Sequence, residues 1–440
     1  MASARISNPA HYTPTDDATA ISVAAQWCLA VQKLATPTSV MAFGTTASAF
    51  VLVGEARKLC LHRYREQPLS ASVLWERLDE FCRAGQFVAG YVGFDAVWAD
   101  TANRTTGQTG AGTNPTLHLW EPEAIVRIDA TPGAQPRVSV LRDAPLIKGL
   151  RPRPLAPATA VSLDEFDRES PRFRAAVAST IEAIRRGESE RLTLARRVDL
   201  PEDLDLLGSF AVPPTPANPE ITRSFYLATP TVEIAGHSPE LLARGDSKRF
   251  VCYKLSGTGP RHPHPGHDAR LRSELLADPK VLQEHALSLQ ATRRALGSVG
   301  SVSAGPMEVV DRRGLRHLMT PLTVDLHAGV TCSTLMQAVL PTGAAPRAAA
   351  LSTLDQLEPG SRGVYYGVLG LRMPDGEFEF SQVLRSLIRD QSGVHTFVGA
   401  AVTGQSTEDG ECAETRLKLD DIVAVRQTSP GRTAGSPTAE

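Results

Sequence analysis

Two glutamates and a lysine near the C-terminus have the spacing of a site that binds a cation and an anion together. In the segment Glu411-Cys-Ala-Glu414-Thr-Arg-Leu-Lys418, the glutamates are three residues apart and the lysine follows four residues later. On a helix, residues at these spacings project from one face. Their carboxylates can hold a hard divalent cation, while the ammonium takes a carboxylate of the substrate. The same spacing is common in exposed charge pairs on solvated helices, so the pattern alone leaves both interpretations open.

Two earlier segments carry groups suited to acid catalysis and anion binding. Glu240 follows a Ser-Pro turn in Gly236-His-Ser-Pro-Glu240. A carboxyl group that is partly buried at a cleft can act as a general acid, whereas at the surface it only caps the next element. Thr258, in Leu255-Ser-Gly257-Thr258, lies in a tight glycine turn whose hydroxyl and amides are of the kind that bind an anionic oxygen. Neither segment is decisive alone.

The composition is that of a soluble globular protein. Of 440 residues, 42% are hydrophobic and 21% charged, and the net charge of -2 offers no basic stripe for a nucleic acid. The six cysteines are scattered without zinc spacing, which indicates reduced thiols. No apolar run approaches the ~18 residues of a membrane span, and the first residues of the sequence show no basic segment followed by an apolar run. We therefore expect a cytoplasmic protein without a membrane partner.

Strong local signals place two helices and several strands around these segments. Ser170-Pro171 and Asp278-Pro279 predict helices over 173–186 and 279–296, each with a cap before its first turn. Strands are predicted over 88–94, 192–198, 224–228, 364–372, 383–389 and 394–403. Many strands with a few long helices outside them indicate α+β layers around one active-site cleft. We expect an N-terminal α+β part of the same fold over 1–160, a catalytic region over 161–427 and a disordered tail over 428–440.

The order of the motifs carries more information than any one of them. Along the chain come Gly-His-Ser-Pro-Glu240-Leu, Leu-Ser-Gly-Thr258, Asp278-Pro-Lys-x-x-x-Glu284-His285, Arg-His317-Leu-Met-Thr320-Pro, Arg362-Gly-Val-Tyr365-Tyr-Gly367, Leu-Arg385-Ser, Gly399-Ala-Ala and Glu411-x-x-Glu414-Thr-x-x-x-Lys418. This order resembles the chorismate-utilising enzymes, which include isochorismate synthase, salicylate synthase, anthranilate synthase component I and aminodeoxychorismate synthase. The resemblance covers residues 165–425, with a weaker match at Gly90-Tyr-Val-Gly-Phe94. It implies large layered antiparallel sheets with helices packed outside around a central cleft, as in anthranilate synthase component I.

The resemblance also implies a role for each matching residue. Glu284, Glu411 and Glu414 would hold a Mg2+ ion that binds the ring carboxylate of chorismate. Glu240 would protonate the departing C4 hydroxyl, with His317 near the leaving oxygen. The remaining substrate contacts would come from Thr258, Tyr365, Arg385, the amides around Gly399, and Lys418. A dianionic substrate needs such a cation and a bidentate arginine.

The sequence departs from the family at the pocket. Members that add water carry a general-base lysine where this chain has Arg191, and arginine keeps its proton at any relevant pH. Arg191 is therefore expected to orient water or an anion. Gly259 stands where members have arginine, Ala401 replaces a glycine, and the loop before Gly343 is shortened.

Three functions follow from these features. The first is isochorismate or salicylate formation in siderophore or other secondary metabolism, favoured by His317-Leu-Met-Thr320-Pro and a chain without a fused glutaminase. The second is use of ammonia, or a lyase or rearrangement reaction on chorismate or isochorismate, favoured by the missing lysine. A glutamine amidotransferase subunit is an expected partner only if ammonia is used. The third is a homologue that binds a chorismate-like ligand without turnover.

Overall fold

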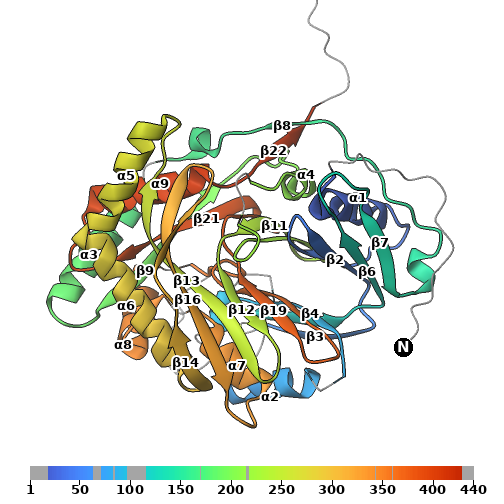
Figure 1. Ribbon diagram of the computed structural model, residues 1–440, viewed down its shortest axis with the longest axis horizontal. Helices are drawn as coiled ribbons and strands as arrows, with labels where there is room; N and C mark the ends of the chain where they lie inside the picture. The colour runs from blue at the N-terminus through green and yellow to red at the C-terminus, as the bar shows by residue number, and fades with distance from the viewer. Residues whose placement is uncertain are drawn as a thin grey trace, which may run out of the picture.

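Two large antiparallel sheets face each other and form the centre of the molecule (Figure 1). The computed structural model describes residues 18–62, 71–82, 85–96, 115–168, 170–214, 218–341, 343–358 and 360–428. The part of the predicted tail beyond residue 428 lies outside these ranges. Within them, each sheet has ten strands and every strand pair is antiparallel. The expected α+β architecture of layered antiparallel sheets is confirmed.

The first sheet runs through strands from both parts of the chain. In spatial order it contains β17 (Ala344–Ala345), β9 (Arg191–Asp199), β21 (Gly393–Val402), β20 (Ser386–Asp390), β11 (Glu233–Ser238), β10 (Arg223–Ala228), β1 (Val40–Gly44), β2 (Ser48–Val53), β6 (Ala124–Asp129) and β7 (Arg137–Arg142). Residues 40–44 of β1 thus pair with residues 224–228 of β10.

The second sheet also combines strands from the N-terminal and C-terminal parts of the chain. Its order is β14 (Gly300–Ala304), β16 (Leu315–Leu326), β13 (Arg249–Pro260), β12 (Leu241–Gly245), β19 (Phe378–Gln382), β18 (Val368–Arg372), β4 (Val88–Val92), β5 (Leu117–Glu121) and β3 (Arg57–Leu61), with β15 (Glu308–Asp311) also paired to β16. A short third sheet joins β22 (Val425–Gln427) to β8 (Ala158–Ala160).

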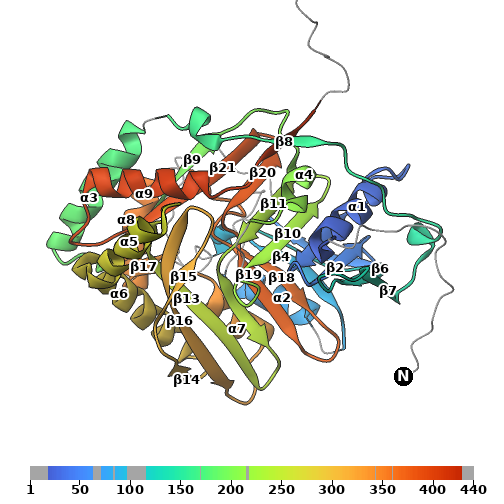
Figure 2. The same cartoon turned by 45° about the horizontal axis from the view of Figure 1, so that its top comes forward.

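Helices cover the outer faces of the two sheets (Figures 1 and 2). They are α1 (Ala20–Gln32), α2 (Ala71–Phe81), α3 (Pro171–Arg185), α4 (Leu206–Ala211), α5 (Pro265–Ala277), α6 (Pro279–Leu296), α7 (Cys332–Val339), α8 (Arg347–Leu357) and α9 (Glu408–Asp420). Helices α1 and α4 share an apolar core with the first sheet, and α2, α3, α7 and α8 share another with the second sheet and the β9–β21 end of the first. A third core, with Phe43, Leu52, Trp120, Phe225 and Leu369, lies between the sheets. The layers are therefore helix, sheet, sheet and helix.

Local capping signals predicted the two long helices. Ser170 accepts a hydrogen bond from the Phe173 amide at 3.2 Å, and Asp278 accepts one from the Lys280 amide at 2.8 Å. Such bonds satisfy donors that the first helical turn leaves unpaired, so Ser-Pro and Asp-Pro are reliable helix starts. The strands predicted over 192–198, 224–228 and 394–403 are present with boundaries within one residue.

Two predicted strands begin later than expected. The strand predicted from residue 364 begins at Val368, and the one predicted from residue 383 begins at Ser386. Tyr366 and Arg385 explain both differences, because they have positive φ angles of 66° and 49°. Few non-glycine residues adopt this left-handed conformation, and it ends a strand. No composition signal marks either position.

Two further structural findings concern the whole described chain. No disulfide joins any of the described cysteines. None of the described helices combines the length and apolar character that crossing a membrane requires.

Candidate active site

Two connections between the facing sheets carry Glu240 and Arg385. The chain passes from β11 to β12 through Glu240, and returns from β19 to β20 through Val383–Arg385. Backbone hydrogen bonds join the connections, from the Gln382 amide to the Glu240 carbonyl at 3.0 Å and from the His237 amide to the Arg385 carbonyl at 3.3 Å. The fold thus brings two predicted site residues, far apart in sequence, to one place.

Glu284 on α6 and the pair Glu411 and Glu414 on α9 form a buried acidic cluster. Burial raises the pKa of Glu284 to about 7, and the negative charge of Glu414 contributes to the rise. The pKa of Glu411 is raised by the same two causes, burial and then the Glu414 charge. The structure therefore places the three predicted metal ligands within electrostatic range of one another.

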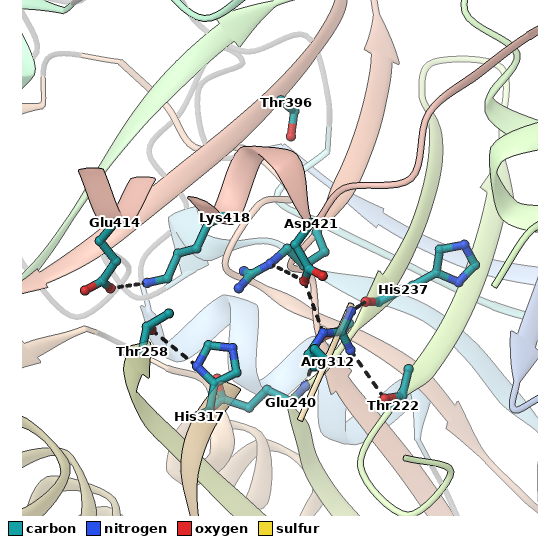
Figure 3. Close-up of polar contacts among 12 residues, drawn as sticks. Thr222, His237, Glu240, Thr258, Arg312, His317, Thr396, Glu414, Lys418 and Asp421 are labelled. Carbon is teal, nitrogen blue, oxygen red and sulfur yellow. Dashed lines mark hydrogen bonds and ion pairs between the residues drawn. The ribbon is translucent and has the colours of Figure 1, made fainter. Parts of the chain in front are cut away.

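Two lysines neutralise part of this cluster. Lys280 Nζ donates to Glu411 Oε1 at 2.7 Å. Lys418 Nζ donates to Glu414 Oε1 at 2.5 Å (Figure 3). It also donates to the Gly399 carbonyl at 2.9 Å. Burial by itself would raise the pKa of Glu414, but Lys418 outweighs it and holds that pKa below its usual value. Lys418 therefore lies at the predicted site, held between a carboxylate and the strand that carries Gly399.

The residues of this cluster fit a magnesium ion in donor chemistry. In the described ranges, no three His, Cys, Asp or Glu side chains lie close enough together to hold a metal in the present arrangement. Yet Glu411 Oε2 is buried without a hydrogen-bond partner among the described residues. A buried carboxylate oxygen without a donor is unfavourable, and hard cations bind such oxygens. Glu284, Glu411 and Glu414 are thus the residues that would hold the ion.

Thr258 and His317 face each other across paired strands β13 and β16. Thr258 Oγ1 lies 3.3 Å from His317 Nδ1, beside a register shift in β13 between Ser256 and Thr258 (Figure 3). His317 Nε2 is buried without a partner among the described residues. Burial lowers the pKa of His317 well below its usual value, and the charge of Arg385 adds to this effect. His317 is therefore a neutral group at neutral pH.

A cluster of two arginines and one aspartate lies near His317, whose pKa the charges of both arginines help to lower. Arg385 Nε and Arg312 Nε donate to the same atom, Asp421 Oδ2, at 3.0 and 3.1 Å. Arg312 also donates to Thr222 Oγ1 and to the His237 carbonyl (Figure 3). The cluster retains one net positive charge, which is what an anionic ligand requires. The terminal nitrogens of Arg385 make no hydrogen bond within the described part of the chain, so they remain able to bind an anion.

Tyr365 lies next to Gly399, which is inside β21 and pairs with Ala195 of β9. A Cβ atom at Gly399 would come within 2.7 Å of the Leu194 carbonyl and 3.3 Å of the Tyr365 hydroxyl, so this position accommodates only glycine without a shift. The Tyr365 ring stacks on Phe397 at 5.1 Å between centroids, and burial raises the pKa of its hydroxyl. Tyr365 is therefore a neutral hydroxyl beside Gly399 and close to Arg385.

Arg191 and Glu240 line a cavity of 490 Å³ beside the acidic cluster, between β9, β13 and α6. Lys254 of β13 also lines it and donates a hydrogen bond to Glu240 Oε1. Arg191 is buried and donates to Thr193 Oγ1 at 3.2 Å. Ser288, one turn beyond Glu284 on α6, lines the same cavity. The other predicted site residues do not line it.

Four charged residues of the site were missed by sequence reasoning: Lys254, Lys280, Arg312 and Asp421. Lys280 could have been found, because it lies four residues before Glu284 and so on the same helical face. The others meet their partners only through the tertiary fold, and no local spacing marks them.

The described geometry can be compared with known proteins. The family of chorismate binding enzymes matches residues 31–424 of this chain. Anthranilate synthase component 1 of Haloarcula marismortui is 32% identical over 62% of this chain and 58% of its own length. The aminodeoxychorismate synthase of Streptomyces pristinaespiralis is 30% identical over 73% of this chain and 44% of its own length. The chain thus spans about half the length of these relatives.

Among solved structures, a 2,3-dihydroxybenzoate-specific isochorismate synthase of Bacillus anthracis has the same fold. Its TM-score is 0.64, at 20% identity, and the match covers 90% of this chain and 98% of that one.

Proposed function

The chain belongs to the family of chorismate binding enzymes, and from that premise we propose that it replaces the C4 hydroxyl of chorismate with ammonia in a Mg2+-dependent reaction. The residue that carries this proposal is Arg191. It is buried at the start of β9, at the cavity that Glu240 also lines. A guanidinium keeps its proton and cannot activate water, whereas ammonia is nucleophilic in its neutral form and needs no strong base. The amine-forming relatives described above support the same choice.

The side chains divide the work of binding between the two ends of the substrate. Mg2+, when bound by Glu284, Glu411 and Glu414, would supply positive charge for the ring carboxylate. Arg385, with Tyr365 and the backbone at Gly399, would hold the enolpyruvyl carboxylate, and the net positive charge of the Arg385, Arg312 and Asp421 cluster favours that anion. Fixed contacts at both ends would orient the ring for substitution.

Glu240 would act on the leaving group between these two ends. It is buried at the crossing between β11 and β12 and faces the cavity. A hydroxyl leaves readily only when it is protonated, so a carboxyl group at this position would lower the barrier. His317 and Thr258, which contact each other across β13 and β16, would offer hydrogen-bonding groups to the substrate.

Isochorismate or salicylate formation is the second candidate, and His317 favours it. The segment His317-Leu-Met-Thr320-Pro resembles the corresponding segment of isochorismate synthases. Burial lowers the pKa of His317, so its ring is neutral, and Nε2 has no hydrogen-bond partner among the described residues. A neutral imidazole with a free ring nitrogen can hold a water molecule in place. This candidate needs a base other than Arg191.

Isotope labelling distinguishes the candidates in one experiment. The purified chain is incubated with chorismate and Mg2+ in 18O-water containing 15N-ammonium, and the products are analysed by mass. Incorporation of 15N without 18O supports amination. Incorporation of 18O alone rejects it in favour of water addition. If calorimetry shows chorismate binding but no product forms, the chain is a binding homologue and both reactions are excluded. A product without either label also excludes both, in favour of a lyase or rearrangement reaction.

A partner subunit that releases ammonia from glutamine is part of the amination proposal. Adding a glutaminase of the amidotransferase type with glutamine should then replace free ammonium as the nitrogen source. Free ammonium serves as the direct test because it needs no partner.

A further inference from the structure

Lys254 forms a salt bridge with Glu240 inside the cavity. The ammonium donates to Glu240 Oε1, and only 15% of the Lys254 side chain and 10% of the Glu240 side chain are exposed. Both residues line the same 490 Å³ cavity. Lys254 is thus a largely buried ammonium in direct contact with the residue that we assign to leaving-group protonation. Its role in the reaction therefore needs an explanation.

The alternation of side chains along β13 places Lys254 on the face of the strand that packs against α6. Side chains two residues apart on a strand lie on one face, so Lys254 shares a face of β13 with Ser256. Ser256 Oγ lies 3.0 Å from Nδ1 of His285, which neighbours Glu284 on α6. Lys254 therefore faces α6 and the cavity.

The charged groups around the cavity differ in their ability to exchange a proton. Arg191 and Arg294 line it together with Lys254 and Glu240. Guanidinium groups keep their protons, whereas an ammonium and a carboxylate in contact can pass one between them. Among the described charged side chains of this cavity, Lys254 and Glu240 are thus the pair suited to proton transfer.

We propose that Lys254 supplies and recovers the proton that Glu240 delivers to the leaving group, an inference that rests on the proposed function. Lys254 first passes a proton to the Glu240 carboxylate and becomes a neutral amine. The C4–O bond then breaks, its electron pair stays with oxygen, and Glu240 gives that oxygen the proton so that water departs. The incoming ammonia forms the new bond to the ring, and the proton it loses returns to the Lys254 amine. No oxidant or further reactant is needed, and the pair ends as an ammonium and a carboxylate again.

Lys254 acts on the reaction through Glu240, so the matched variant is Lys254→Arg. Arginine keeps the positive charge beside Glu240 but cannot give up its proton. If Lys254 transfers protons, Lys254→Arg lowers kcat by about 10²–10⁴-fold, the range for general acid–base catalysis, with KM nearly unchanged. Lys254→Met lowers kcat as well. Lys248→Arg, at an exposed position before β13, is the control and keeps wild-type rates.

The experiment measures kcat, KM and the pH profile of kcat for the wild type and these variants, with melting temperatures to confirm folding. Lys254→Ala with added propylamine gives a second readout, because a free amine can enter the space left by the lysine and restore turnover to the original product. If Lys254→Arg retains wild-type kcat and pH profile, Lys254 only holds the charge of Glu240 and the inference is overturned. If the wild type itself does not turn over chorismate, the proposed function fails, and this inference fails with it.

Discussion

Arg385 donates a hydrogen bond from Nε to Oδ2 of Asp421 at 3.0 Å, so its guanidinium has an anionic partner inside the protein. Sequence reasoning assigned Arg385 to a carboxylate of the substrate and did not identify Asp421. Asp421 caps the C-terminal end of α9, where the helix dipole disfavours a carboxylate. Arg385 and Arg312 together offset that effect. The arrangement fixes Arg385 in place before any ligand arrives.

Replacing Asp421 tests how much stability this arrangement contributes. Asp421→Asn keeps the shape but leaves two buried guanidinium groups without their anion, and we expect a loss of about 3–5 kcal/mol in the free energy of unfolding. Urea denaturation measures it. Asp420→Asn, at the exposed neighbouring position, is the control. Equal stability of the two variants would show that the arginines find other partners.

Arg385→Ala tests the substrate role of the same cluster. Its terminal nitrogens are the free donors that we assign to the enolpyruvyl carboxylate, so we expect weaker chorismate binding by about 2–5 kcal/mol. Titration calorimetry gives the dissociation constant. Arg389→Ala, a partly exposed arginine of the same strand region paired with Glu233, is the control. An unchanged dissociation constant for Arg385→Ala would remove Arg385 from the substrate site.

Glu414→Gln tests the magnesium site. The substitution removes one charged oxygen ligand, and we expect weaker Mg2+ binding and a smaller stabilisation of the fold by Mg2+ with chorismate. Calorimetry and thermal unfolding measure the two effects. Asp409→Asn, exposed in the first turn of the same helix, should behave as wild type. A variant that binds Mg2+ like the wild type would contradict the assignment of Glu414.

Arg191→Lys tests whether the absence of a lysine base at this position limits the addition of water. A lysine at this position could act as a base, so we expect addition of water to chorismate to rise by about 10²–10⁴-fold. Isochorismate is measured by mass. The opposite result is equally informative: if the natural protein already forms isochorismate at ordinary rates and Arg191→Lys slows it, the base lies elsewhere.

We expect buried His237 to lower the free energy of unfolding as the pH becomes acidic. Burial lowers its pKa to about 4, while Nδ1 lies 2.7 Å from Ser224 Oγ and Nε2 lies 3.1 Å from the Ser209 carbonyl. An unfolded histidine has a pKa of about 6.5. Between these values the unfolded chain binds a proton that the folded chain does not, so stability falls as pH decreases from 6.5 to 4. The contribution of His237 to this loss reaches about 3 kcal/mol.

Urea denaturation at pH 7 and at pH 4.5 measures this effect. His237→Gln should show a shallower pH dependence than the wild type, whatever its absolute stability. His264→Gln, at an exposed position, should keep the wild-type slope. Identical slopes for all three proteins would mean that other groups cause the acid sensitivity.

Local sequence signals predicted the elements better than the connections between them. Ser170 and Asp278 begin helices through hydrogen bonds to amides two or three residues away, which a sequence shows directly. The positive φ of Arg385 depends on the passage of the chain from β19 to β20, which no neighbouring residue reveals. The proposed division at residue 160 and the tail beyond 428 remain predictions.

The site residues show the same limit. The acidic cluster could be predicted because the order of motifs identified both segments that supply it, now seen as α6 and α9. Lys254, Arg312 and Asp421 escaped prediction because each finds its partner across strands or helices distant in sequence. Motif order thus predicted that three glutamates from α6 and α9 lie near one another, but not the charges that balance them; their role as metal ligands remains a prediction.

The pairing of β1 with β10 bears on how this protein is made in a cell. Residues 40–44 leave the ribosome well before residues 224–228, and at about 5–20 residues per second the delay is on the order of 10–40 s. During that interval an apolar strand edge of the nascent chain has no native partner. We expect newly made chains to depend on holding chaperones until β10 emerges, and slower translation of the first half to increase aggregation.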